Sequence, residues 1–278
     1  MALINGTDVA RDITEQTTKR AYEFEQRTGR KPCLAAVLVG EDPASVTYVK
    51  MKRNRSAKAG IESRFVQLPA ETTTEQLVAE ITKLSEDDGV DGILLQHPVP
   101  GHIDERAAFE AIAPGKDVDG VTMHSFAAMA FSEPGFHSAT PGGIMRLLEA
   151  YDVDLKGKHA AVIGRSPILG KPVAMLLLAK DATVTICHSK TANLDEIVRT
   201  ADIVVAAVGK PNFITAIKPG AVVIDAGYNE GNVGDVDFDQ VADDASLITP
   251  VPGGVGPTTI AVLLEQTVSA AIRRSEDM

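Results

Sequence analysis

Apolar and polar positions along this chain follow two periods, one typical of buried strands and one typical of amphipathic helices. Short apolar runs, such as residues 33–40 and 159–164, are each followed by a segment whose apolar positions recur every three or four residues. Parallel strands need crossover connections, which are usually helical. The pattern therefore predicts an α/β protein with largely parallel sheets and two lobes.

The predicted elements form two series on either side of a Pro/Gly-containing stretch over 133–143. The first has helices over 7–28, 48–59 and 74–87 and strands over 33–40, 63–68 and 92–96. The second has helices over 144–151, 171–180 and 193–200 and strands over 159–164, 183–187, 203–208 and 221–225. We expect a catalytic domain over 1–119, completed by a C-terminal helix over 258–278, and a Rossmann-like domain over 120–257.

Composition restricts the class of protein. The chain has 278 residues, of which 44% are hydrophobic, and its net charge is −11 with dispersed basic residues, which argues against a nucleic-acid partner. No apolar run approaches the roughly 18 residues that span a bilayer, and the start lacks the features of a secretory signal. We expect a soluble cytoplasmic protein without a membrane partner.

Cys33 and Cys187 are predicted as buried free thiols, and the scattered histidines predict no metal site.

A glycine-containing loop over 164–172 lies between a predicted strand and a predicted helix, where backbone N–H groups can hold a phosphate. It departs from the dinucleotide fingerprint because Ser166 replaces the middle glycine and the spacing is one residue longer. Pro172 stands where a Walker A loop needs a hydroxyl residue, so ATP hydrolysis is excluded. Taken alone, the loop is also compatible with a plain strand–helix turn.

The end of the next predicted strand favours NADP as the cofactor. NAD-specific domains place an acidic residue there for the ribose 2′-hydroxyl, whereas this strand ends in His188, Ser189 and Lys190. Arg165 in the glycine loop adds a further donor for a 2′-phosphate. The third strand ends at Gly209 among small residues, which let a flat ligand approach the backbone. Asp225 ends the fourth, where it could bind a ligand, although a cap or turn role is favoured.

Four polar residues are candidates for chemistry in the first lobe. Tyr48 and Lys52 lie one helical turn apart and can share a face, Gln96 ends a strand, and Asp119 lies in a turn-like segment. Singly, they could be a solvated lysine, a strand cap and a turn residue. Together they predict an active site. Short-chain dehydrogenases also use Tyr-x-x-x-Lys, but downstream of the cofactor loop, so the order here excludes them.

In this order, the motifs resemble the bifunctional methylenetetrahydrofolate dehydrogenase/methenyltetrahydrofolate cyclohydrolase family from end to end. They lie at 40–45, 48–52, 96–100, 116–120, 140–141, 164–172 and 252–257. The resemblance implies NADP-dependent oxidation of 5,10-methylenetetrahydrofolate and hydrolysis of the methenyl product to 10-formyltetrahydrofolate. It also implies a homodimer and a place in one-carbon metabolism and purine biosynthesis.

The resemblance further implies residue roles. Tyr48 would stack on the folate, Lys52 would be the catalytic amine, Gln96 would position it, Asp119 would hold the pterin, and Pro257 would line the same cleft. The residues implied at the cofactor are Thr140, Gly164, Arg165, Ser166, Gly170, His188, Ser189 and Gly209.

Four positions depart from the family's common pattern without removing a proposed catalytic group: His97, Ala139, Pro167 and Thr258. Strand alternation turns His97 away from the face of Gln96, although a titrating imidazole nearby could change the pH profile. Two alternatives remain at this point. One is an NADP dehydrogenase of the shikimate or amino-acid type, which would lack cyclohydrolase activity. The other is a nucleotide-binding module without turnover, which would not require Lys52.

Overall fold

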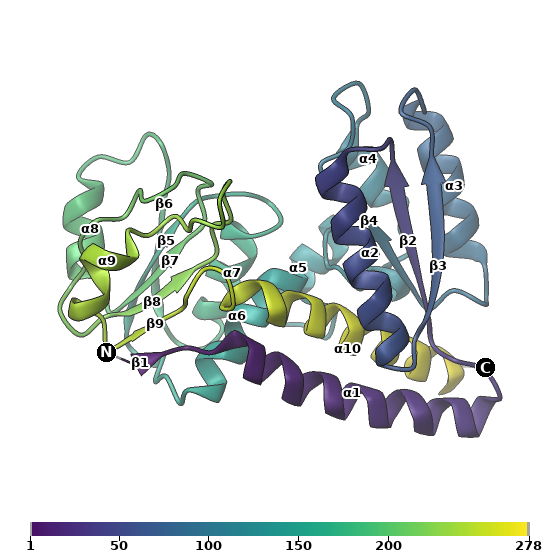
Figure 1. The fold of residues 1–278 in the computed structure, drawn as a ribbon, viewed down its shortest axis with the longest axis horizontal. Coiled ribbons are helices and arrows are strands. Elements are labelled where there is room, and N and C mark those ends of the chain that lie inside the picture. Colours follow the sequence, from purple (N-terminus) through teal and green to yellow (C-terminus); the bar gives the residue numbers. More distant parts are fainter. Residues whose placement is uncertain (1, 277–278) are drawn as a thin grey trace. The chain divides into compact units, whose positions relative to one another are not determined.

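The computed structural model describes residues 2–276, except for the side chain of Ala44 (Figure 1). Met1 and residues 277–278, which the predicted first domain includes, lie outside the described residues. The chain divides into two compact units. The six-stranded unit comprises the residues up to Arg11, Ala128–Pro134 and Ser138–Val262, and the three-stranded unit comprises Asp12–Ala127, Gly135–His137 and the residues from Leu263.

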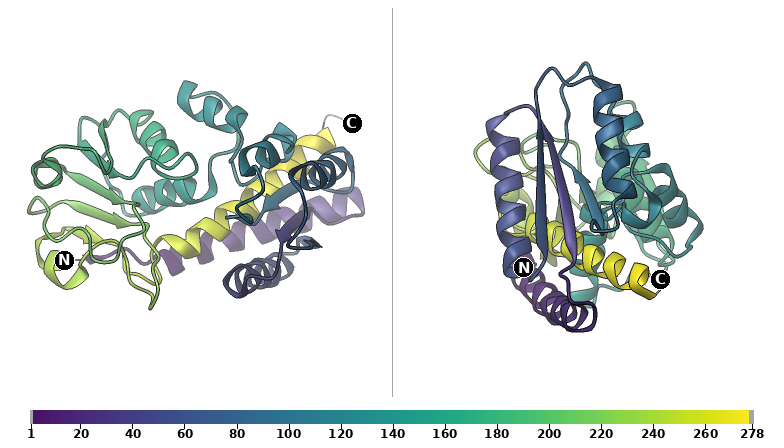
Figure 2. Two further views of the ribbon diagram at one scale, coloured as in Figure 1. Left: turned by 90° about the horizontal axis from the view of Figure 1, so that it is seen from above. Right: turned by 90° about the vertical axis from the view of Figure 1, so that its right-hand side faces the viewer.

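The three-stranded unit is built on a parallel sheet in the order β3-β2-β4. Its strands are β2 (Cys33–Val39), β3 (Glu62–Leu68) and β4 (Gly92–Leu95). Every residue of the central strand β2 is buried, which agrees with its unbroken apolar run. Figures 1 and 2 show α2 (Pro43–Lys58) and α3 (Thr74–Glu86) on opposite faces of this sheet.

Local caps fix where these helices begin. The carboxylate of Asp42 accepts a hydrogen bond from the backbone N–H of Ser45 at 2.8 Å, and Pro43 occupies the first turn of α2. Thr73 and Gln76 form a reciprocal capping box at the start of α3. As a result, α2 begins only a few residues after the carboxyl end of β2.

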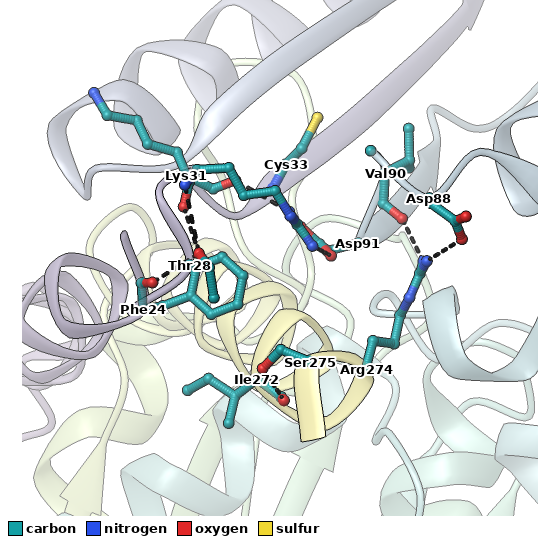
Figure 3. A network of polar contacts seen from close by, with 12 residues as sticks. Phe24, Thr28, Lys31, Cys33, Asp88, Val90, Asp91, Ile272, Arg274 and Ser275 are labelled. Carbon is teal, nitrogen blue, oxygen red and sulfur yellow. Dashed lines mark hydrogen bonds and ion pairs between the residues drawn. The ribbon is translucent and has the colours of Figure 1, made fainter. Parts of the chain in front are cut away.

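A buried ion pair stabilises the entry to β2 and β4. Arg30 donates two hydrogen bonds to the fully buried carboxylate of Asp91, at 2.7 and 2.8 Å, and the N–H of Cys33 donates a third at 2.9 Å. Figure 3 labels Asp91 and Cys33 of this group and shows a second contact, in which Arg274 binds the carbonyl of Val90 and the exposed carboxylate of Asp88. Asp91 therefore joins the starts of two neighbouring strands.

The six-stranded unit has a parallel sheet in the order β1-β9-β8-β7-β5-β6. The strands are β1 (Ala2–Leu3), β5 (His159–Ile163), β6 (Thr183–Cys187), β7 (Ile203–Ala206), β8 (Val222–Asp225) and β9 (Leu247–Ile248). Alternate residues of β5 enter two separate cores, with Ala160 and Val162 in one and Ala161 and Ile163 in the other. Helices α6 (Ala139–Ala150) and α7 (Gly170–Leu178) cover the first core, and α8 (Leu194–Thr200) and α9 (Phe238–Val241) the second.

Strand order reverses at β5, which pairs with β6 on one side and β7 on the other. Ile163 at its carboxyl end lies opposite both Cys187 and Ala206. In open parallel sheets this reversal leaves a crevice outside the carboxyl ends of the strands, where ligands bind. The residues that follow β5, β6 and β7 are therefore placed for binding.

Several short elements were not predicted from the sequence, namely β1, β9, α9, α4 (Glu105–Glu110) and α5 (Met123–Phe131). They are too short, or too uniformly apolar, to show a clear period. Helix α6 already begins at Ala139 instead of after the Pro/Gly stretch, because Pro141 lies in its first turn, where no N–H is needed. Since β1 pairs with β9, the chain start lies in the six-stranded unit, unlike in the predicted division. The predicted boundaries of the catalytic domain and of the Rossmann-like domain stay a prediction.

Helix α10 (Val255–Glu276) is long and apolar enough to cross a membrane by length and composition alone. However, 61% of its most apolar window is buried inside the protein, as in the core helix of a globular domain. Within the three-stranded unit it packs along α1 (Gly6–Thr28), where Arg20 donates to Ser269 at 3.0 Å. A core role explains its composition. Cys33 and Cys187 are buried free thiols, as predicted.

Candidate active site

A lysine and an amide side chain meet in the three-stranded unit. Lys52 comes from α2, and Gln96 follows the last residue of β4. The Nζ of Lys52 donates a hydrogen bond to Oε1 of Gln96 at 3.1 Å. The Nε2 of Gln96 donates to the carbonyl of His97 at 3.0 Å, and its backbone N–H donates to Val37 at 2.8 Å. The amide is held from both sides, so its oxygen faces the lysine.

Asp119 acts electrostatically on this lysine. Burial lowers the pKa of Lys52, and the charge of Asp119 opposes that shift. Burial also raises the pKa of Asp119, which the charges of Lys52 and His97 partly offset. Each group is therefore displaced toward its neutral form. Within residues 2–276, no hydrogen bond engages the carboxyl group of Asp119, so both of its oxygens can accept bonds from a ligand.

Two buried charged residues fix the segment that carries Asp119. The carboxylate of Asp117 accepts bonds from the N–H groups of Val121 and Thr122, both at 3.0 Å, and from Oγ of Ser125 at 2.6 Å. The ammonium of Lys116 donates to carbonyls at the end of α3, and burial lowers its pKa to about 8. These supporting roles were missed, because the sequence shows only a charged turn and not which side chains are buried.

Tyr48 and His97 complete the surroundings. Tyr48 is partly exposed on α2, one turn before Lys52, which is compatible with a shared face. The ring of His97 meets Phe109 of α4 edge-on, with 5.8 Å between ring centroids and 83° between planes. His97 thus packs against the protein while its charge still acts on Asp119.

The glycine loop of the six-stranded unit has no room for side chains at its two glycines. Gly164 has φ +131°, and a Cβ there would lie 2.2 Å from the carbonyl oxygen of Ala207. A Cβ on Gly170 would lie 2.2 Å from the carbonyl oxygen of Gly164. The loop therefore folds back tightly onto the first turn of α7. No side chain caps that helix from Leu169. Pro172 has no N–H, and the N–H of Lys171 donates to the carbonyl of Ser166 at 3.0 Å, so the donor suited to a phosphate in this first turn is the N–H of Gly170.

The turn after β6 presents donors and no carboxylate. The N–H of His188 donates to Oγ1 of Thr191 at 2.8 Å, and the N–H of Lys190 donates to Nδ1 of His188 at 3.1 Å. Because Nδ1 accepts a bond, the neutral imidazole carries its proton on Nε2. These two hydrogen bonds fix the backbone of the turn. The side chains of Ser189 and Lys190 therefore lie where NAD-specific domains have an acidic residue for the ribose 2′-hydroxyl.

Asp225 has a structural role, which agrees with the favoured interpretation of its position. It is buried at the end of β8 and accepts bonds from the N–H groups of Gly227, Asp235 and Val236 at 2.9, 3.0 and 2.9 Å. Burial raises its pKa. Asp235, which was not singled out from the sequence, is fully buried as well. Nothing in the residues around it indicates burial.

Thr140 and Pro257 also lie in the six-stranded unit. Thr140, in the first turn of α6, accepts a bond from Oγ1 of Thr259 in α10 at 3.2 Å. A Cβ on Gly143 would come within 2.8 Å of Oγ1 of Thr258, so the two helices pack closely. The structure brings Lys52, Gln96 and Asp119 together in one unit and assigns Pro257 and the predicted cofactor residues to the other. In the described part of the chain, no group of three or more metal-ligating side chains occurs.

A parallel sheet with a tight glycine loop at its reversal point defines a dinucleotide-binding unit. A buried lysine held by an amide, beside a carboxylate, is typical of an active site. The chain is thus a two-unit, nucleotide-dependent enzyme by its fold and sites.

The comparison with known families names it more closely. The family description "Tetrahydrofolate dehydrogenase/cyclohydrolase, catalytic domain" matches residues 4–119, and the description "Tetrahydrofolate dehydrogenase/cyclohydrolase, NAD(P)-binding domain" matches residues 138–275. The chain therefore belongs to the tetrahydrofolate dehydrogenase/cyclohydrolase family. This confirms the predicted family, fold class and enzyme class, and it decides against a shikimate-type dehydrogenase and an idle nucleotide-binding module.

Individual relatives agree with this family assignment. A Bifunctional protein FolD 1 of Streptomyces avermitilis is 72% identical over 271 residues, covering 97% of this chain and 94% of the relative. The crystal structure of a bifunctional FolD enzyme from Campylobacter jejuni has a TM-score of 0.96 at 42% identity and covers 99% of both chains. A Trypanosoma brucei FolD structure complexed with NADP cofactor and inhibitor has a TM-score of 0.94 at 38% identity, covering 99% of this chain and 98% of that one.

Proposed function

We propose that this chain oxidises 5,10-methylenetetrahydrofolate with NADP⁺ and hydrolyses the resulting 5,10-methenyltetrahydrofolate to 10-formyltetrahydrofolate. The observation that carries the proposal is the 3.1 Å contact between Lys52 and Gln96 beside Asp119, in a member of this family. The contact holds an amine whose pKa is lowered by burial, and the hydrolytic step requires such an amine.

The residues of the six-stranded unit fit NADP. The tight loop from Gly164 to Gly170 would hold the pyrophosphate, with the N–H of Gly170 at the start of α7 as a donor. Arg165, Ser189 and the Nε2–H of His188 would bind the 2′-phosphate, since no acidic residue there repels it. Ser166 and Thr140 are further cofactor contacts in this proposal, and Gly209 offers a flat approach.

The residues of the three-stranded unit fit a folate. A pterin has adjacent N–H donors, and the two oxygens of Asp119 can accept a pair of them. Tyr48 presents an aromatic ring for stacking. Pro257, which belongs to the other unit, stays a prediction from the family resemblance. Asp119 and Tyr48 would hold the folate by its pterin.

The dehydrogenase step needs alignment more than proton transfer. When bound, NADP⁺ supplies an acceptor for the hydride that leaves the methylene bridge of the folate. The contribution of the chain is to orient the pterin through Asp119 and Tyr48 and to keep the bridge carbon fixed. Lys52 is needed mainly for the next step.

In the hydrolytic step, neutral Lys52 acts as the base. The methenyl bridge is cationic, so the protonated amine is disfavoured beside it, and burial already lowers the pKa of Lys52. The amine takes a proton from water as the oxygen bonds to the bridge carbon. It then returns the proton to the leaving nitrogen as the C–N bond breaks, and the new hydroxyl group loses its proton to solvent as the C=O bond forms, which gives the N10-formyl product. Gln96 keeps the amine in place throughout.

A direct assay tests the proposal. Purified protein is incubated with 5,10-methylenetetrahydrofolate and either NADP⁺ or NAD⁺, and reduced cofactor and methenyl compound are followed by absorbance. We expect reduction with NADP⁺ in preference to NAD⁺, and hydrolysis of the methenyl compound faster than in buffer. Absence of reduction with both cofactors would contradict the dehydrogenase assignment, and hydrolysis at the buffer rate would contradict the cyclohydrolase assignment.

The remaining expectations concern context and rest on the family resemblance. The enzyme would be a cytoplasmic homodimer that supplies one-carbon units to purine biosynthesis. Light scattering of the purified protein tests the dimer, and a monomeric mass would contradict it.

A further inference from the structure

Asp235 uses its carboxylate to bind three successive backbone N–H groups in the loop that follows β7. Its Oδ2 accepts from Val208 at 2.6 Å and from Gly209 at 2.9 Å, and its Oδ1 accepts from Lys210 at 2.9 Å. Oδ1 also accepts from Nδ2 of Asn229 at 3.0 Å. Consecutive N–H groups that converge in this way form an anion-binding concavity. Here the anion is supplied by the protein itself.

The segment around Asp235 is fixed in turn. The carboxylate of Asp225 accepts from the N–H groups of Asp235 and Val236, and the carbonyl of Asp235 accepts from Phe213 at 2.7 Å and Ile214 at 2.9 Å. Asp225 extends from the end of β8, so two buried carboxylates in series connect the ends of β7 and β8. The loop is thereby attached to the sheet.

Glycines make this connection possible. A Cβ on Gly227 would lie 2.2 Å from Cγ of Asp235, and a Cβ on Gly234 would lie 1.9 Å from Oδ2 of Asp225. Neither position accepts a side chain without displacing a carboxylate. The two acids and the two glycines thus form one local arrangement. It fixes the backbone of residues 208–210, which we call the Gly209 loop.

The position of this loop indicates which half of a dinucleotide it would meet. In doubly wound sheets the adenosine ribose lies at the end of the strand that follows the glycine loop along the chain, here the edge strand β6, and the rest of the dinucleotide crosses the reversal point. β7 lies on the other side of β5 from β6. Because Asp235 occupies the N–H groups of residues 208–210, this loop can offer a flat backbone surface, but these N–H groups cannot form a phosphate site.

We propose that Asp235 is a positioning residue that holds the Gly209 loop in the conformation that receives the nicotinamide half of NADP. The proposal rests on the proposed cofactor of this enzyme. Asp235→Asn keeps the shape of the side chain but leaves at least one N–H group of the loop facing an amide N–H₂. The loop then shifts, and only binding of the nicotinamide half is weakened.

The test compares two probes by fluorescence titration and calorimetry, NADPH and adenosine 2′,5′-diphosphate, which lacks the nicotinamide half. For Asp235→Asn we expect the Kd of NADPH to rise about ten-fold, as one lost hydrogen bond to a charged group allows. The Kd of adenosine 2′,5′-diphosphate should stay within about two-fold, and hydrolysis of the methenyl compound without NADP should be unchanged. Asp239→Asn, an exposed neighbouring change, is the matched control.

Weakened binding of both probes would overturn the proposal, because it would show general damage to the unit. Unchanged binding of both would overturn it too. If wild-type protein binds neither probe, the cofactor assignment itself is wrong, which separates failure of the cofactor assignment from failure of the role of Asp235.

If Asp235→Asn does not fold, Asn229→Ala removes one partner of Asp235 at a partly exposed site. It should weaken NADPH alone by about three-fold, and an unchanged Kd for NADPH would overturn the proposal.

Discussion

The Nζ of Lys52 donates a 3.1 Å hydrogen bond to Oε1 of Gln96, which links the middle of α2 to the end of β4. The lysine has no comparable hydrogen bond to Asp119 among the described residues, and the carboxylate acts on it only through its charge. An amide is a suitable partner for a base, because it holds the amine without adding a negative charge that would stabilise the ammonium form.

Lys52→Met should abolish the hydrolytic activity and leave folate binding intact. The methionine keeps a long side chain on α2 but cannot take a proton from water, and general-base catalysis is worth about 10²–10⁴-fold in rate. Loss of methenyl absorbance measures the effect. Lys50→Met, an exposed change on the same helix, is the control and should retain full activity. Hydrolysis at the wild-type rate by Lys52→Met would rule out this role.

Gln96→Glu should move the pH profile of hydrolysis to higher pH. The rising limb of the profile reports the loss of a proton from Lys52, whose pKa burial lowers. A carboxylate in place of the amide stabilises the ammonium form and raises this pKa, so the neutral base appears only at higher pH. The rate is measured between pH 6 and 10, after the buffer rate is subtracted. Gln96→Ala should lower the rate without this alkaline shift, and an unmoved limb in Gln96→Glu would contradict the prediction.

Asp119→Ala should impair both activities through the folate. The carboxylate has no hydrogen-bond partner among residues 2–276 and is proposed to accept N–H bonds from the pterin. A lost pair of bonds to a charged group corresponds to a rise of about 100-fold in the KM for folate. The KM for NADP⁺ should change little. Near-normal folate affinity would remove Asp119 from the binding site.

Gly164→Ala should remove NADP binding selectively. The added Cβ would lie 2.2 Å from the carbonyl of Ala207, and φ +131° is rarely adopted by alanine. We expect loss of dehydrogenase activity and of NADPH binding, with hydrolysis of the methenyl compound retained because that step needs no cofactor. Gly157→Ala, at another positive φ but in open space, is the control for backbone strain alone. Equal NADPH affinity in the Gly164 variant would show that the loop does not contact the cofactor.

Asp91→Ala should destabilise the protein far more than Asp88→Ala, although each aspartate binds an arginine in the same region (Figure 3). Asp91 is fully buried, and its removal takes both carboxylate bonds from Arg30 and leaves the buried N–H of Cys33 without a partner, which costs about 1–3 kcal/mol for the unsatisfied donor alone. The side chain of Asp88 is 91% exposed, so its pair with Arg274 contributes about 0–1 kcal/mol. Urea unfolding measures both, and equal losses would contradict the argument.

Local pattern in the sequence determined most of the secondary structure. The apolar runs at β2 and β5 and the helical periods that follow them predicted an α/β protein, because strand and helix periods are properties of neighbouring residues. The Gly164–Gly170 loop and the missing acid after β6 were also visible, since they depend on residue type at fixed spacing. Short elements such as β1 and α9 were not, because a few residues show no period.

The tertiary structure alone decided which polar residues support the fold and which are presented to a ligand. Asp117, Asp119, Asp225 and Asp235 all occur in turn-like segments with glycine nearby. Three of them each accept two or three hydrogen bonds from backbone N–H groups, whereas Asp119 accepts none among the described residues. The contact between Lys52 and Gln96 likewise joins distant parts of the chain. Burial and hydrogen-bond partners depend on long-range packing, which no local pattern of residues specifies.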